Sequence, residues 1–346
     1  MKNSKLRRIV FELKANLKHC KYGLKNKDSF KCSNELSPIT GRFWTHQYQL
    51  ASGIQSDKYL SETYYHNRVE GKLNNYTVAG YLDHKGYIDT VLGSHTIKCL
   101  INKISNCIYN ENNENNEIIT ISQMVDILTA EDGREFVVKV STGTGGGIGV
   151  TIGTFAKVKT TIEKLLNNKT DFIIQPLISQ HPELSKFNPT SINTLRLMTM
   201  RCHGEIHFVS AILRMGNGGR VDNASSGGIS IGMDIFGKLN KRGFNYSLNK
   251  IFYTHPFSNI DFADDHHVPH FDEIVALAKE KHKNLKSQDL VSWDLTVDQD
   301  GVISIVEYNI LWSDISFHQA NNGPVFEPFF DFIKELNTKN PKKITI

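Results

Sequence analysis

The chain has 346 residues, of which 39% are hydrophobic and 22% are charged. A chain of this length and composition buries a large core and is expected to divide into two or three lobes. Its 40 Lys and Arg side chains against 36 Asp and Glu give a net charge of +4, too even a balance to predict a nucleic-acid-binding protein. The five cysteines form no C-x-x-C pair, which argues against the common zinc and redox motifs and favours a reduced, cytoplasmic protein.

The start of the chain, residues 1–23, has the pattern of a basic amphipathic helix. Four apolar residues recur at helical spacing: Leu6, Val10, Leu13 and Leu17. Lysine and arginine side chains fill the other faces. Two interpretations stay open, because the helix can dock on the body of the protein or lie on an anionic membrane surface at the inner face of the membrane. No stretch is apolar enough for a secretory signal or a membrane span.

Residues 40–72 mix aromatic and polar side chains without a strand pattern and are expected to be helical. The polar run NENNENNE at 110–117 is typical of an exposed loop or hairpin tip. A short helix is expected over 121–130 and a β-branched strand over 135–140. That strand leads into the glycine-rich run STGTGGGIG and out into a second strand, GVTIGTF.

The remainder of the chain consists mostly of strand patterns. These are DFIIQPLI, SINTLRLMTMR, EIHFVSAILRM, LVSWDLTVD and VISIVEYNI. Two segments have helical periodicity, FDEIVALAKEKHKNL and EPFFDFIKELN. This order predicts an α+β enzyme with an extended, largely antiparallel sheet.

The glycine-rich run lies between two apolar strands, which a flexible linker would not do. Its glycines let the backbone approach a ligand and turn successive N–H groups toward phosphate oxygens. It is not a Walker A loop, because no Gly-Lys-Ser/Thr leads into a helix, and it lacks the G-x-G-x-x-G spacing of a dinucleotide fold. We therefore expect a hairpin whose glycine tip closes over a nucleotide.

Lys139 lies on the strand that enters this hairpin. Phe136, Val138 and Val140 alternate on one face of the strand. Val137 and Lys139 are left on the opposite face, where the ammonium can reach phosphate beneath the glycine loop. An exposed strand lysine is the alternative, and the pattern alone does not decide between the two.

Three side chains with oxygen ligands lie on the last pair of predicted strands. Asp294 lies in VSWDLTV, and Glu307 and Asn309 follow the turn DQDG in IVEYNI. Residues two apart on a strand face the same way, and a hairpin can bring Asp294 beside the other two. Carboxylate and amide oxygens are ligands that Mg²⁺ takes beside phosphates. A salt bridge with an arginine is the alternative for one of the three.

Arg196 and Arg214 lie on apolar strands, where a guanidinium needs an anionic partner. The candidate partners are ATP phosphates, a substrate carboxylate and the metal-binding acids. Between the arginines and the acids lies VDNASSGGISIG at 221–232, a polar stretch able to approach a ligand closely. No histidine spacing indicates a metal site, and we assign no general base.

In their order along the chain these motifs resemble the ATP-grasp superfamily, specifically its sugar-transfer-associated branch, which is found with polysaccharide biosynthesis. The segments that carry the resemblance are LDHKGY, VVKVSTGTGGGIGV, IQPLISQHPEL, NTLR, VDNASSGGI, WDLTV and VEYN. The resemblance implies an α+β ATP-grasp fold, with two α+β subdomains clasping ATP. The implied divisions are an N-terminal, mainly helical accessory region at 1–75, the first part of the ATP-grasp unit at 76–117, a small lid subdomain at 118–178, and a large subdomain with the Mg²⁺ site at 179–346.

The resemblance also implies ATP and Mg²⁺ as cofactors and a role for individual residues. Asp294, Glu307 and Asn309 match the magnesium ligands. Arg196, Arg214 and Lys139 match the cations around the transferred phosphoryl group. The implied nucleotide contacts are Lys85, Lys139, Ser141, Gly145, Gly146, Gly147, Gln175, Pro176, Leu177, Ile178, Glu183 and Asn223.

The complete set predicts a site that uses ATP, and the resemblance implies an ATP-dependent carboxylate-amine ligase that works through an acyl phosphate and releases ADP. By the resemblance, the amide would join a uronic acid of a surface polysaccharide or its precursor to an amino acid or amine. Two alternatives stay open: a phosphotransferase acting on a sugar, and a non-catalytic nucleotide-binding component of glycan assembly. The expected partners are a glycan or sugar carboxylate and an amine, with no nucleic acid.

Overall fold

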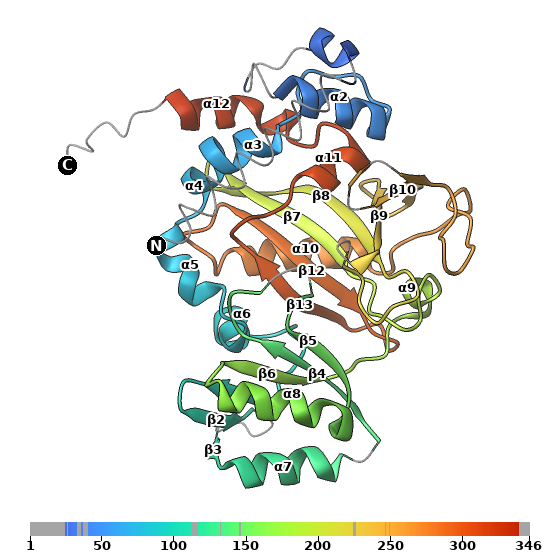
Figure 1. The fold of residues 1–346 in the computed structure, drawn as a ribbon. Helices are drawn as coiled ribbons and strands as arrows, with labels where there is room; N and C mark the ends of the chain where they lie inside the picture. The colour runs from blue at the N-terminus through green and yellow to red at the C-terminus, as the bar shows by residue number, and fades with distance from the viewer. Residues whose placement is uncertain are drawn as a thin grey trace, which may run out of the picture.

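The computed structural model describes residues 25, 27–32, 36, 41–111, 117–131, 133–144, 147–223, 226–245, 247–248 and 250–338. The basic helix expected at 1–23 lies outside these residues, as do Gly145 and Gly146 of the glycine run. The described residues form two antiparallel sheets, with a group of helices beside the larger one (Figure 1). No helix among them is long and apolar enough to cross a membrane.

The smaller sheet has six strands and carries the glycine-rich hairpin. In spatial order its strands are β3 (Glu117–Ile119), β2 (Cys107–Asn110), β1 (Ile101–Ile104), β6 (Phe172–Pro176), β4 (Glu135–Val140) and β5 (Val150–Thr154). The helices α7 (Ile121–Ala130) and α8 (Phe155–Asn167) pack on it over a core that includes Phe136, Val138 and Phe172 (Figure 1). The expected hairpin around 110–117 is confirmed, because β2 and β3 pair antiparallel.

The division expected at residue 117 falls inside this small sheet. β1 pairs with β2 on one side and with β6 on the other. The segment 76–117 therefore contributes strands to the same sheet as the expected lid at 118–178. These short strands lacked a clear alternation in the sequence, and their pairing partner β6 lies about seventy residues further along the chain.

The larger sheet has seven strands, and every neighbouring pair is antiparallel. In spatial order they are β11 (Ile251–Phe252), β10 (Leu239–Asn245), β9 (Ile229–Met233), β8 (Glu205–Met215), β7 (Leu195–Cys202), β12 (Leu290–Val297) and β13 (Ile303–Asn309). The strands predicted from residue 135 onward are all present. β9, β10 and β11 are additional strands.

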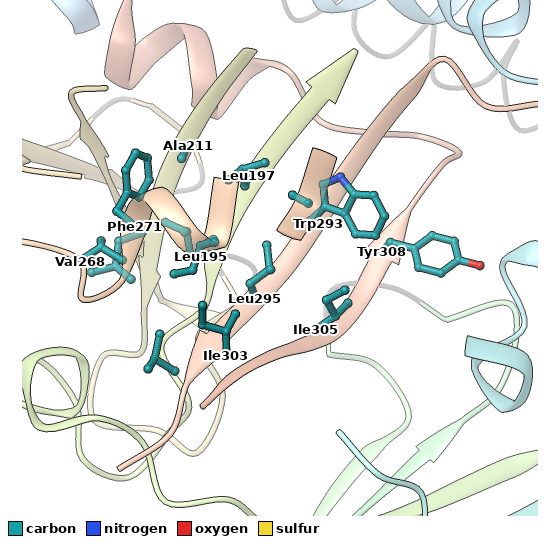
Figure 2. Close-up of a cluster of buried hydrophobic side chains, with 14 of the residues drawn as sticks. Leu195, Leu197, Ala211, Val268, Phe271, Trp293, Leu295, Ile303, Ile305 and Tyr308 are labelled. Carbon is teal, nitrogen blue, oxygen red and sulfur yellow. The ribbon is translucent and has the colours of Figure 1, made fainter. Parts of the chain in front are cut away.

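One face of the large sheet packs against α10 (Phe271–His282) and is apolar. Figure 2 shows Trp293 and Leu295 of β12 in this cluster, together with Phe271 of the helix. The Trp293 ring lies 5.8 Å from the ring of Tyr308, centroid to centroid. Its indole N–H donates a hydrogen bond of 2.8 Å to Thr199 Oγ1, so the one polar atom of this large side chain is paired.

The opposite face is covered in part by α11 (Ser316–Asn322), a short helix with mostly polar side chains. Asn322 donates to Ser210 Oγ at 2.8 Å and Asn321 donates to Ser230 Oγ at 3.0 Å, on β8 and β9. These hydrogen bonds replace the apolar contacts that usually fix a helix on a sheet.

The helical character expected for residues 40–72 is confirmed. This region forms α2 (Gly41–Ser52), α3 (Glu62–Tyr64), the π-helix η2 (Tyr65–Val69) and α4 (Glu70–Leu73). It packs against α11, where Tyr48 Oη lies 2.8 Å from Ser316 Oγ. The remaining helices are η1 (Lys27–Lys31), α5 (Tyr76–Leu82), η3 (Lys85–Tyr87), α6 (Ile88–Leu92), α9 (Pro182–Ser185), η5 (Glu327–Phe329) and α12 (Phe330–Thr338).

Candidate functional site

The charged side chains gather on the face of the large sheet that α10 does not cover. On β12, Trp293 and Leu295 belong to the apolar cluster, so Asp294 between them points to the other face. Arg196 on β7 and Arg214 on β8 also alternate with residues of that cluster. Strand periodicity alone therefore brings an acid and two arginines to one surface.

A β-bulge in β13 places Glu307 on the same surface. Asp294 pairs with Glu307, but the next residue, Leu295, pairs with Ile305, so Val306 is an extra residue in β13. Ile305 lies in the apolar cluster, whereas Glu307, two residues later, lines a cavity on the opposite side. Without the bulge, two residues at this spacing would face the same way.

The strand pairing aligns the charged residues in a row. Arg196 lies opposite Asp294 in the β7 and β12 pair, and Asp294 lies opposite Glu307 in the β12 and β13 pair. Asn309 lies opposite Ser292, two residues along the same face. The predicted placement of Asp294, Glu307 and Asn309 on one face of a hairpin is thus confirmed.

Asp294 is held by two arginines. Arg196 Nε donates to Asp294 Oδ1 at 2.8 Å and Arg196 Nη2 donates to Oδ2 at 2.7 Å, while Arg214 Nη2 lies 3.3 Å from Oδ2. Burial raises the pKa of Asp294, but the charges of Arg196 and Arg214 outweigh burial and hold that pKa well below its usual range. The salt bridge with an arginine, considered as the alternative for one of the three oxygen-ligand residues, is therefore formed by Asp294. Carboxylate oxygens accept about two hydrogen bonds each, so a capacity for a further ligand remains.

Lys139 faces these acids from the small sheet. Val137 and Lys139 both line the cavity, whereas Phe136 and Val138 pack in the core. The alternation predicted for this strand is therefore confirmed, and Lys139 is not an exposed strand lysine.

A second lysine accompanies Lys139. Lys85 Nζ lies 3.8 Å from Glu307 Oε2. Desolvation lowers the pKa of Lys139, and the charge of Lys85 adds to this, while the charge of Glu307 acts in the opposite direction. Two ammonium groups held near each other in a desolvated place are stabilised by an anionic ligand.

The cavity between the two sheets has a volume of about 420 Å³. Its charged lining residues are Lys85, Lys139, Arg214, Arg220, Asp222, Asp294 and Glu307. Its apolar lining residues include Ile97, Val137, Ile148, Val150, Ile152, Leu177, Ile178, Val221 and Val306. A cavity of this size and mixed lining fits a ligand with one apolar ring system and one polyanionic part.

The end of β6 and the connection that follows it form one wall of this cavity, from Gln175 to Ile178. Gln175 Nε2 donates to the carbonyl of Ile97 at 2.7 Å, and its Oε1 is buried without a hydrogen-bond partner in the described part of the chain. The N–H of Leu177 donates to the carbonyl of Glu135 at 2.9 Å. The wall is therefore fixed to the small sheet and presents an unpaired acceptor.

The glycine loop approaches the large sheet at Gly147. Gly147 has a φ of +79° and lines the cavity. A Cβ atom at this position would collide with the side-chain amide of Asn223. The position therefore needs glycine both for its backbone conformation and for this close approach.

A salt bridge that the sequence did not reveal joins the two sheets across the cavity. Arg220 lies after β8, and Glu135 begins β4. Arg220 Nη1 and Nη2 donate to the two carboxylate oxygens of Glu135 at 2.8 and 2.7 Å. No spacing in the sequence relates two residues 85 positions apart, so only the fold shows this pair.

Asp222 and Thr194 form a second network that the sequence did not single out. The Thr194 N–H donates to Asp222 Oδ2 at 3.0 Å, and the Thr194 hydroxyl donates to the same oxygen. Arg214 Nε and Nη2 donate to Thr194 Oγ1 at 3.0 and 2.7 Å. The network fixes the Arg214 guanidinium at the cavity wall. Its sequence signals were the segment NTLR, which contains Thr194, and the polar stretch that contains Asp222.

The structure brings most of the predicted site residues to this cavity. Those that line it are Lys85, Lys139, Gly147, Gln175, Pro176, Leu177, Ile178, Arg214, Asn223, Asp294 and Glu307. Arg196 and Asn309 lie beside it in the sheet, and Ser141 is buried nearby with an unpaired Oγ in the described structure. Glu183 does not line the cavity, and its carboxylate lies 2.5 Å from Lys186 Nζ.

The metal-binding potential of the site rests on oxygen ligands. Among the described residues, no group of three or more His, Cys, Asp and Glu side chains is placed to hold a metal ion. The third member of the proposed set is an amide, Asn309, whose Nδ2 is buried and unpaired within the described structure. Two carboxylates and one amide fit Mg²⁺, which keeps water and phosphate oxygens as further ligands.

Comparisons with known proteins place this site in a family context. A sequence model for sugar-transfer associated ATP-grasp proteins matches residues 64–334. No curated protein sequence matches the chain.

Several solved structures resemble the chain at low sequence identity. The biotin carboxylase domain of Hydrogenobacter thermophilus 2-oxoglutarate carboxylase is 11% identical with a TM-score of 0.43, and the match covers 72% of this chain and 47%, about half, of that one. D-cycloserine synthetase is 13% identical with a TM-score of 0.45, covering 75% and 73%. The D-alanine–D-alanine ligase of Bacillus anthracis is 16% identical with a TM-score of 0.44, covering 80% and 78%.

Proposed function

The chain belongs to the sugar-transfer-associated ATP-grasp family, and we propose that it is an ADP-forming ligase that joins a carboxylate to an amine. The observation that carries this proposal is the arrangement of charges in one cavity. Lys85 and Lys139 from one side face Arg214, Asp294 and Glu307 from the other. Cations for phosphate oxygens and acids for a metal ion are the groups that phosphoryl transfer requires.

In this proposal the nucleotide lies between the two sheets. The adenine lies against Val137, Ile152 and Leu177, where Gln175 has an unpaired acceptor. The phosphates lie among Lys85 and Lys139, under the glycine loop. Lysine ammonium groups and loop N–H groups together neutralise phosphate charge.

Glu307 and Asn309 would hold Mg²⁺, with Asp294 as a third oxygen donor. Glu307 lies 3.8 Å from Lys85 Nζ and also contacts the side chain of Asp294, which brings the two carboxylates together beside the Asn309 amide. Once bound, Mg²⁺ supplies charge neutralisation on the phosphate oxygens and orients the transferred group.

The proposed reaction has two steps, phosphoryl transfer to the carboxylate and attack by the amine. A carboxylate oxygen of the first substrate attacks the γ-phosphorus, and ADP leaves with the electrons of the broken P–O bond. Arg214 and Lys139 stabilise the negative charge on the transferred phosphoryl group. The amine then attacks the acyl carbon, the C–N bond forms, and the C–O bond to phosphate breaks. Arg196 keeps Asp294 ionised and oriented during both steps.

For the substrates we propose a uronic acid of a surface polysaccharide or its precursor and an amino acid or amine. The support is the family's association with sugar transfer. The carboxyl group of a uronic acid is the only group of such a sugar that phosphoryl transfer can convert into an acyl phosphate.

The test is incubation with ATP, Mg²⁺, oligosaccharides that contain glucuronic or galacturonic acid, and hydroxylamine as a small nucleophile. We expect ADP and a hydroxamate of the uronic acid. The exposed Lys159 on α8 gives a matched control, since Lys159→Met should keep the activity that Lys139→Met loses. Release of AMP would refute the acyl-phosphate route, and phosphate retained on a sugar hydroxyl would indicate a phosphotransferase.

A further inference from the structure

The loop 310–315, which leaves β13 directly after Asn309, carries an exposed tryptophan in an unusual conformation. Trp312 has a φ of +57° and is 41% exposed. A left-handed backbone is uncommon for a bulky residue and persists only where surrounding contacts enforce it.

The accessory region supplies those contacts. The imidazole of His66 lies 5.4 Å from the Trp312 ring, centroid to centroid. His66 Nδ1 lies 3.0 Å from Glu70 Oε2, and Nε2 lies 3.0 Å from Glu62 Oε1. The N–H of Ser313 donates to the other oxygen of Glu70 at 3.1 Å. The π-helix between the two glutamates therefore fixes the loop next to the metal-binding strand, and π-helical turns often mark functional sites.

Asp314 is the acid of this loop. It keeps part of its surface accessible, and its Oδ1 accepts a hydrogen bond of 2.9 Å from the N–H of Ser316. The charged groups around it are Glu62, His66 and Arg196. Desolvation and the charge of Glu62 raise the pKa of Asp314 to about 7, against the opposing charges of Arg196 and His66.

Polar side chains on the elements around Arg196 lack partners. Ser292 Oγ, Asn309 Nδ2 and both ring nitrogens of His318 are buried and make no hydrogen bond within the described structure. Ser292 lies opposite Asn309 in the sheet, and His318 interacts electrostatically with Arg196 and Asp294. Buried polar groups are nearly always paired, so this concentration points to a polar ligand at the end of the site.

The signs of the charges indicate what that ligand is. The cavity side of the row carries the cations Lys85, Lys139 and Arg214. The loop side carries three acids, Glu62, Glu70 and Asp314, against one cation, the His66 imidazolium that lies between the first two. An indole face and a carboxylate together attract an ammonium group, through cation–π attraction and a charge-assisted hydrogen bond.

We propose that Trp312 and Asp314 form the amine subsite of this enzyme and take a primary ammonium group. The proposal rests on the ligase function and names the position of its second substrate. Asp314 accepts one proton from the ammonium, and the free amine attacks the acyl carbon. The C–N bond forms, the phosphate leaves with the electron pair of the C–O bond, and it takes the second proton that nitrogen loses on becoming an amide.

The experiment is calorimetric titration of ethanolamine, a small primary ammonium compound, into the full chain saturated with a non-hydrolysable ATP analogue and Mg²⁺. Ethylene glycol is the uncharged comparison. We expect saturable binding of ethanolamine alone. Asp314→Asn should weaken it about 10- to 100-fold and Trp312→Ala about 2- to 30-fold, whereas Asp314→Glu should restore most of the affinity. Asp300→Asn, in the exposed β12–β13 turn, is the matched control.

Several outcomes would overturn the proposal. They are no saturable ethanolamine binding to the wild type, equal binding of ethylene glycol, or a loss in Asp300→Asn as large as in Asp314→Asn. Affinity for the ATP analogue reports whether each variant is folded. Failure of the ligase function has a different readout, because it appears as the absence of hydroxamate from every uronic acid, whatever the ethanolamine affinity.

Discussion

The two faces of the large sheet are built from the same strands but serve different purposes. On the α10 face, Trp293 and Leu295 are fully buried in an apolar cluster (Figure 2). On the opposite face, the residue between them, Asp294, is equally buried but binds two arginines. Burial of apolar area stabilises the first face, whereas burial of charge opposes folding on the second unless each group finds a partner.

This difference indicates that the apolar face supplies most of the stability, whereas the charged face supplies the functional groups. The polar face carries an unpaired polar atom at Ser292, and the groups that lie against it include the desolvated Lys139 of the small sheet and the unpaired ring nitrogens of His318 on α11, within the described structure. Such groups persist in a folded protein when a bound ligand supplies their missing partners. Substitutions on the two faces should therefore separate loss of folding from loss of activity.

The largest effect on stability is expected on the apolar face. Trp293→Ala should lower the free energy of unfolding by about 3–5 kcal/mol, because it removes a fully buried ring and leaves a cavity. Urea denaturation measures this. Trp312→Ala is the matched control, since that ring is 41% exposed, and it should change the free energy of unfolding by much less. Equal losses in the two variants would contradict the division between the faces.

On the side of the charged cavity, Lys139→Met should lower the rate of ADP release about 10²- to 10³-fold, because it removes a cation aimed at the phosphates. The free energy of unfolding should stay the same or increase, since a desolvated ammonium is replaced by an apolar side chain of similar length. Steady-state kinetics and urea denaturation together test this. A destabilised Lys139→Met variant would show that the lysine supports the fold.

The His66 cluster makes stability depend on pH. Burial lowers the pKa of His66, but hydrogen bonds and charges of Glu62 and Glu70 outweigh burial and raise it to about 10 from 6.5. The stabilisation is complete below pH 6.5 and is lost as pH rises through about 10. Relative to His66→Gln, the unfolding free energy of the wild type should fall in this range by at most about 1.4 kcal/mol per pH unit. Parallel pH curves of the two proteins would refute the charged state of His66.

The smallest effect is expected at the bridge between the sheets. Arg220→Ala should change the free energy of unfolding by less than about 1 kcal/mol, because the pair with Glu135 is partly exposed. It should raise the KM for ATP severalfold, since the cavity would close less firmly. Arg134→Ala, which removes a similarly exposed pair with Glu131, is the control and should leave the KM unchanged.

Strand alternation was enough to predict the central hairpins and the direction of several side chains. Lys139 and Asp294 face the cavity as their neighbours indicated, since period-two patterns are local. Contacts across long sequence separations could not be predicted in this way, and the Arg220–Glu135 pair is one of them. α11 was missed for another reason, because its sequence SFHQANN lacks an apolar stripe and is held by amide hydrogen bonds.

The single extra residue at Val306 has a consequence for how this site can change by insertion or deletion. The bulge shifts the alternation of side chains in β13 by one residue, so every side chain after it points to the face opposite the one that a regular strand would give. Deleting Val306 would restore a regular ladder but leave Glu307 opposite Asp294 and Asn309 opposite Ser292, because paired residues share one face of the sheet. Keeping Val306 in a regular ladder would instead turn Glu307 and Asn309 into the apolar cluster, so the metal ligands tolerate loss of this residue but not its entry into the regular alternation.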